Sequence, residues 1–143
     1  MRYILFYFIF APEPDLVKEV TLLKYQFELM KRMIQSDEYP FFMFVIDHEF
    51  EEEQVNALLK VLFTFNDRLT DGKVSIFAQS DHLFSQFNLP LDVLYSSEEP
   101  DLNEFKRYIT KIFYQEFKLE YLLLSLKKQH IFVNVCDYLL EQL

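Results

Sequence analysis

Glycine is almost absent from this chain of 143 residues, because Gly72 is the single one. Sandwiches and barrels need many tight turns, and such turns usually require glycine, so these all-β folds are disfavoured. The Walker and Rossmann phosphate-binding motifs each need several glycines, and neither motif is present. The scarcity of glycine therefore predicts few connections and long helices.

Cysteine and basic residues are also scarce. One cysteine, Cys136, excludes an internal disulfide and suits a reducing cytoplasm. Its apolar neighbours indicate a small core residue rather than a nucleophile. Lys and Arg number 14 against 23 Asp and Glu, and the net charge of −9 argues against binding to a nucleic-acid backbone. The acidic surface favours solubility; a basic protein partner or mimicry of nucleic acid is the alternative.

Apolar residues, by contrast, are plentiful. They make up 51% of the chain, including 17 Phe and 9 Tyr, which excludes a disordered protein. The length suits one domain with a core of its own. Apolar surface in excess of what that core can bury is usually covered by another subunit, so the composition favours a homo-oligomer.

Residues 1–14 begin with an apolar run, MRYILFYFIF, that ends at Ala11-Pro12-Glu13-Pro14. The run is too short for a transmembrane helix, which needs about 20 apolar residues. No small-x-small cleavage site follows it, so a signal peptide is disfavoured. We interpret residues 1–14 as an apolar extension or a buried strand, with peripheral membrane attachment as a weaker alternative. Residues 15–143 then form a single helical domain.

A stripe of hydrophobic residues spaced by three or four positions follows Asp15, a candidate N-cap. This spacing predicts a long amphipathic helix, whose stripe either packs on the core of its own subunit or forms a seam between subunits. The seam candidates are Leu16, Val20, Leu23, Phe27, Met30 and Ile34.

The stretch Tyr39–Asp47 is almost entirely apolar and flanked by amphipathic segments, so we expect it at the centre of the fold. Pro40 suits the first position of a helix, and a short helix over 41–48 is favoured over a buried strand. Glu51 to Glu53 would begin the next helix, which Gly72 would end in a left-handed conformation. Its predicted inner face is Val55, Leu58, Leu62, Phe65 and Leu69.

In the rest of the chain, the secondary structure is harder to predict in some segments than in others. Residues 74–77 fit either a strand or a helical turn, and 80–87 fit a brief helix. Asp101 opens a capping-box pattern, although a cap one turn earlier is the alternative, and helices are expected over 119–128 and 131–143. The predicted fold is therefore an all-α bundle of about five to six helices. The inner face of the helix after Asp101 would be Leu102, Phe105, Ile109, Ile112 and Phe113.

The sequence Asp37-Glu38-Tyr39-Pro40-Phe41-Phe42, followed by Ile46-Asp47 and an acidic helix start, resembles the YhaI-like proteins of Bacillus and relatives. The resemblance covers about two-thirds of the chain. It implies a small, all-helical, cytoplasmic protein that self-associates through interlocking helices, in a family with no established activity. The chain departs from the family at residues 1–15, at 73–97, and at His130, where glycine is usual.

Few residues lie in a pattern that is typical of catalysis or metal binding. His48 and Glu52 would share a face on a continuous helix and could bind a metal, but a solvated helix start is favoured. Asp47 could act as an acid or base, yet capping the next helix is the favoured role. No catalytic, metal or cofactor-binding residue is therefore predicted.

Two hypotheses for the function follow. The favoured one is a non-enzymatic module for self-association and protein binding. The alternative is a small enzyme or ligand-binding protein with an aromatic-lined pocket near Tyr39, Phe41 and Asp47.

Overall fold

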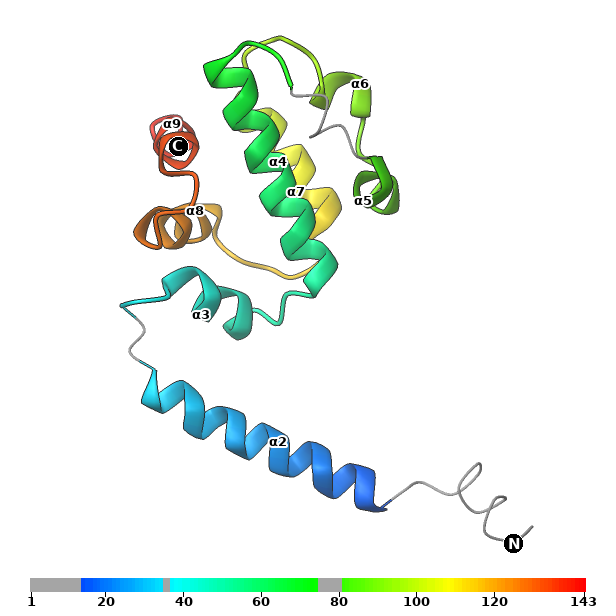
Figure 1. Ribbon diagram of the computed structural model, residues 1–143, viewed down its shortest axis with the longest axis vertical. Helices are drawn as coiled ribbons and strands as arrows, with labels where there is room; N and C mark the ends of the chain where they lie inside the picture. Colours follow the sequence, from blue (N-terminus) through cyan, green and yellow to red (C-terminus); the bar gives the residue numbers. More distant parts are fainter. Residues whose placement is uncertain (1–13, 35–36, 75–80) are drawn as a thin grey trace, which may run out of the picture. The chain divides into compact units, whose positions relative to one another are not determined.

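The computed structural model describes residues 14–34, 37–74 and 81–143 (Figure 1). These residues form eight helices and no strand, so the all-α prediction is confirmed, although the number of helices exceeds five to six. The chain divides into two compact units, Met1–Ser36 and Asp37–Leu143. The predictions for residues 1–13 and for most of 74–77 lie outside the described residues.

The described part of the first unit is helix α2, Pro14–Met33. The prediction of Asp15 as its N-cap is wrong, because the helix begins at Pro14 and Asp15 lies within its first turn. Proline is common at the first position of a helix. Asp15 in the first turn and Lys31 and Arg32 in the last complement the helix dipole. The predicted stripe is exposed along its whole length in a single copy of the chain.

Helix α4, Glu52–Thr70, is central to the second unit and contacts α5, α7 and α9. It begins with a capping box in which the backbone nitrogen of Glu51 donates to Oε1 of Gln54 over 2.9 Å. It ends before Gly72, whose φ of +69° confirms the predicted left-handed conformation. Its fully buried apolar residues are Ala57, Leu58, Val61, Leu62 and Phe65.

Three helices follow α4: α5 (Asp81–Gln86), α6 (Leu91–Leu94) and α7 (Leu102–Ile112). Helix α5 confirms the brief helix predicted near residues 80–87, whereas α6 was not foreseen. Asp101 caps α7 as predicted by accepting a hydrogen bond from the backbone nitrogen of Glu104 over 2.7 Å. All five residues of the predicted inner face of α7 are buried.

Helix α3 (Pro40–Asp47) packs on α8 (Leu119–Lys128), which in turn packs on α9 (Val133–Leu140). Pro40 opens α3 as predicted, and the bounds of α8 agree with 119–128. Helix α9 is shorter than the predicted 131–143, because His130 and Phe132 have positive φ values of 62° and 47° and delay its start. This left-handed turn places Ile131 and Phe132 beside the partly buried edge of the core.

None of the helices in 14–34, 37–74 and 81–143 combines the length and the apolarity needed to cross a bilayer.

Candidate functional site

An apolar groove lies on the second unit, between α3, α4, α5 and the turn before α9. Its volume is about 820 Å³. We call it the aromatic groove, and its lining residues are Phe41, Phe42, Val55, Asn56, Leu59, Lys60, Phe63, Leu83, Ile131 and Phe132.

The position of the first two groove residues is set by a side chain from the far end of α8. Oε1 of Gln129 accepts hydrogen bonds from the backbone nitrogens of Phe41 and Phe42, at 2.8 and 3.1 Å. Tyr39, the N-cap residue of α3, supplies no side-chain cap of its own. Gln129 therefore satisfies two of the donors that every helix start leaves open. Phe41 is thereby fully buried, whereas Phe42 is 51% exposed at the groove.

The opposite wall of the groove comes from α4. Phe63 is 43% exposed and meets the ring of Phe132 edge to face, with ring centroids 6.4 Å apart. Among the described residues that line the groove, Asn56 is the one with an amide side chain and Lys60 the one with a charge. Nζ of Lys60 lies 5.9 Å from the ring centroid of Phe84. With no pair of titratable side chains in its lining, the aromatic groove suits binding of an apolar surface rather than acid–base catalysis.

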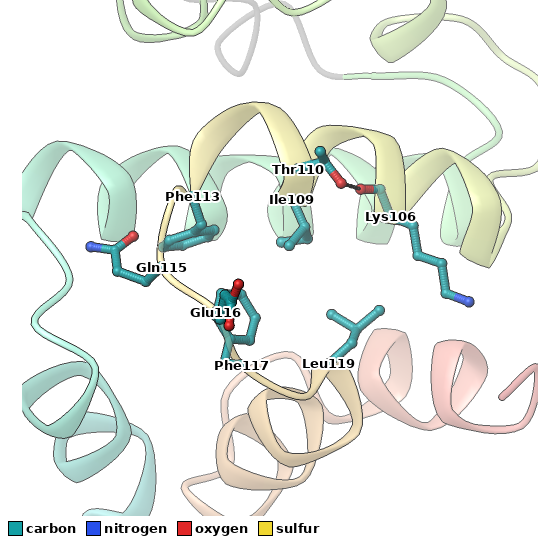
Figure 2. A pocket seen from close by; sticks show the side chains of 8 residues that line it. All are labelled: Lys106, Ile109, Thr110, Phe113, Gln115, Glu116, Phe117 and Leu119. Atoms are coloured by element: carbon teal, nitrogen blue, oxygen red, sulfur yellow. Dashed lines mark hydrogen bonds between the residues drawn. The ribbon is translucent and has the colours of Figure 1, made fainter.

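A second hollow of about 450 Å³ lies between α7, the connection after it and the start of α8 (Figure 2). Figure 2 shows Ile109 and Phe113 on one side, facing Phe117 and Leu119 on the other. The charged residues of its lining are Lys106 and Glu116, on different elements. The described residues of this lining include no His, Cys or second carboxylate, so they offer neither a nucleophile with a base nor a metal-ligand set.

A cluster of aromatic rings lies at the end of the apolar stretch Tyr39–Asp47. His48 stacks on Phe44 with centroids 4.0 Å apart, and its Nδ1 lies 2.9 Å from the backbone oxygen of Phe44. Phe50 packs on Phe113 at 4.3 Å, and Phe117 meets Phe44 edge to face at 5.8 Å. The cluster joins α3 to the C-cap of α7 and to the connection that precedes α8 through ring packing. We therefore assign His48 a packing role.

The metal hypothesis for His48 and Glu52 is wrong on geometry. Helix α3 ends at Asp47, Glu49 has a φ of 55°, and α4 begins only at Glu52. The two residues therefore do not share a helix face. No group of three or more potential metal ligands occurs in the described ranges of the chain.

The four residues of the predicted motif do not form one site in the structure. Phe41 lines the aromatic groove, and Pro40 opens α3. Tyr39 and Asp47 are exposed and do not belong to the lining of the groove. The capping role predicted for Asp47 is wrong, because Glu51 occupies the N-cap of α4. An aromatic-lined pocket is thus present near Phe41, but without the other two residues that were predicted to line it.

One buried polar network was missed by the sequence analysis. Nη2 of Arg68 donates to Oε1 of Glu104 over 3.0 Å, and the hydroxyl of Tyr108 donates to Oε2 of Glu104 over 2.8 Å. Nε of Arg68 donates to the backbone oxygen of Glu98 over 2.9 Å. Burial, with the hydrogen bond to Glu104, raises the pKa of Tyr108 and keeps its phenol protonated. The network ties α4 to α7 inside the core.

The single thiol is inert. Cys136 is fully buried, and burial raises its pKa to about 12. A catalytic cysteine needs a lowered pKa and access to solvent. The prediction that Cys136 is a core residue is confirmed.

Comparison with known proteins places the chain in a family. The chain belongs to the family described as protein of unknown function (DUF1878), whose model matches residues 14–143. No curated protein and no solved structure matches the chain.

Proposed function

We propose that this protein is a non-enzymatic module that self-associates through helix α2. The observation that carries the proposal is the seam of six apolar side chains, five along α2 and Ile34 directly after it, each of which is at least 41% exposed in one copy. The seam residues are Leu16, Val20, Leu23, Phe27, Met30 and Ile34. The proposal includes membership of the YhaI-like proteins and a location in the cytoplasm.

The exposed apolar side chains of the seam favour association. Burial of apolar surface yields about 25 cal/mol per Å², and a large contiguous apolar patch on a protein surface is typical of an interaction site. Five further apolar residues of α2 are exposed on the other faces of the helix, outside the seam. They are Val17, Leu22, Tyr25, Leu29 and Met33.

The test is the mass of the full chain in solution, measured by light scattering after size exclusion. We expect an oligomer at micromolar concentration. Phe27→Asp places a charge in the seam and should shift the mass to that of a monomer. Tyr25→Asp is the matched control, because Tyr25 lies on the opposite face of the same helix and is also exposed.

A monomeric full chain would overturn the proposal. Equal dissociation by Phe27→Asp and Tyr25→Asp would also count against it, since the seam would then not be the contact.

The volume of the aromatic groove supports a second candidate, binding of a small apolar ligand. Its roughly 820 Å³ falls within the range usual for small-molecule sites. A ligand-binding protein should show a rise in melting temperature with at least one class of apolar metabolite. Phe63→Asp should abolish that rise, whereas a flat response across metals, nucleotides and metabolites would contradict this alternative.

A further inference from the structure

We propose that the aromatic groove binds a monocarboxylic acid with an apolar body, the chemical class that includes the fatty acids. This ligand class rests on the second candidate function, binding of an apolar ligand, and adds to it the head group that is recognised. It does not depend on association through α2. The carboxylate binds at Asn56 and Lys60, the two polar residues among the described lining of the groove.

The wall of the groove that α4 forms is divided into an apolar and a polar line of side chains. Val55, Leu59 and Phe63 are spaced by four positions and therefore follow one line along the helix. Asn56 and Lys60 are also four positions apart and form the neighbouring line. A ligand that lies across both lines meets polar groups at one edge and apolar groups elsewhere. The groove is therefore suited to an amphipathic molecule.

The polar line lies on the side of α4 that faces α5. Nζ of Lys60 is 5.9 Å from the ring centroid of Phe84, which belongs to α5. The apolar line instead meets the turn before α9, where the ring of Phe63 contacts that of Phe132, and the exposed ring of Phe42 adds to the apolar lining. The head of the ligand therefore lies toward α5, and its apolar body toward α3 and the turn before α9.

The charge of the lining favours an anion with one negative charge. Lys60 is the one charged residue of the described lining, although the unit Asp37–Leu143 has nine Lys and Arg against nineteen Asp and Glu. Salt screens exposed charges beyond about 8 Å, so the nearby ammonium outweighs the acidic surface. Its three N–H donors let Lys60 bind a carboxylate while it keeps contacts within the protein. A phosphate monoester carries a charge of about −1.5 to −2, which one lysine would not neutralise.

The backbone of the turn before α9 is an independent sign of a binding site. His130 and Phe132 have φ values of 62° and 47°, a region that is unfavourable for residues with bulky side chains. Strained residues of this kind persist only where their surroundings hold them, and they are concentrated at ligand-binding and active sites. Here the strained turn brings Ile131 and Phe132 into the lining of the groove.

The experiment is calorimetric titration of the full chain, at neutral pH, with decanoic acid below its micellar concentration and with n-decanol. We expect the acid to bind about tenfold more tightly, because a hydrogen bond to a charged group is the stronger kind. Lys60→Met should abolish this preference and leave binding of decanol unchanged, which also shows that the groove is intact. Lys60→Arg keeps the charge and should keep the preference. Lys106→Met is the matched control, because Lys106 lines the second hollow.

Equal affinity for the acid and the alcohol, or a preference that survives Lys60→Met, would overturn the carboxylate site but leave binding of an apolar ligand intact. Binding of neither probe would overturn both, while light scattering tests self-association separately. Loss of the preference in Lys106→Met alone would place the acid in the second hollow and overturn the inference. Binding that appears only in Phe27→Asp would also overturn it, because the seam of α2 would then occupy the groove.

Discussion

Oε1 of Gln129, at the end of α8, accepts the backbone N–H of Phe41, in the first turn of α3, although 88 positions separate the two residues. The same oxygen accepts the N–H of Phe42. A glutamine distant in sequence thus replaces the N-cap that Tyr39 does not provide. The bond links the end of one helix to the start of another and fixes the first wall of the aromatic groove.

Gln129→Ala should therefore destabilise the protein by about 1 kcal/mol, the usual effect of losing a helix cap. Urea unfolding followed by circular dichroism gives the free energy. Gln129→Glu keeps an acceptor oxygen and should retain most of the stability. Equal losses in both variants would show that the cap does not stabilise α3.

The pair Arg68 and Glu104 yields a second prediction. Both side chains are buried, so Arg68→Met leaves a carboxylate without its counter-charge and should cost about 3–5 kcal/mol. The double change Arg68→Met with Glu104→Gln removes both charges and keeps an acceptor for the hydroxyl of Tyr108. It should recover a large part of that loss.

Lys127→Met is the control for the buried pair. Lys127 forms an ion pair with Asp137 at 2.6 Å, but its side chain is 44% exposed, so its removal should cost less than about 1 kcal/mol. Chemical denaturation of the four proteins measures the differences. A loss for Arg68→Met no larger than that for Lys127→Met would contradict a stabilising buried network.

The features that the sequence predicted correctly depend on neighbours within a few positions. Pro40 at a helix start, Asp101 as an N-cap and Gly72 after a helix all follow from the local preferences of the backbone. The inner face of α7 follows from apolar spacing, because a helix with one apolar stripe must bury it. The predicted face of α4 is correct for Leu58, Leu62 and Phe65, whereas Val55 and Leu69 are only partly buried.

The features that could not be predicted from the sequence depend on pairs of residues that are far apart in the chain. Nothing near Gln129 marks it as the cap of α3, and nothing near Arg68 marks Glu104 as its partner 36 positions away. Phe132 could not be foreseen in a left-handed conformation, because that region is unfavourable for a bulky residue unless its surroundings fix it. The aromatic groove combines α3, α4, α5 and the turn before α9, so its lining required the tertiary structure.

Phe41 and Phe42 are adjacent in sequence but differ in burial, which gives a third prediction. Phe41 is fully buried, so Phe41→Ala should reduce the free energy of unfolding by about 3–5 kcal/mol. Phe42 is half exposed, so Phe42→Ala should cost much less. Unfolding curves of the two variants measure the difference, and equal destabilisation by both would contradict the burial difference.

The pH dependence of stability should carry a signature of Cys136. Burial raises the pKa of its thiol from 9.0 to about 12, so the native state keeps a proton that the unfolded state releases. Its contribution to stability is therefore complete below pH 9.0 and is lost progressively as the pH rises toward about 12. Each pH unit within that window removes about 1.4 kcal/mol.

Cys136→Ala isolates this effect from the tyrosines that titrate in the same range. The difference in unfolding free energy between wild type and variant should shrink by about 2 kcal/mol from roughly pH 8 to roughly pH 10.5. In the same window the native thiol should react far more slowly with a thiol-specific reagent than the thiol of the urea-unfolded chain, because the thiolate is the reacting form. A difference that stays constant with pH, together with fast native labelling, would show that Cys136 is accessible and its pKa is not raised.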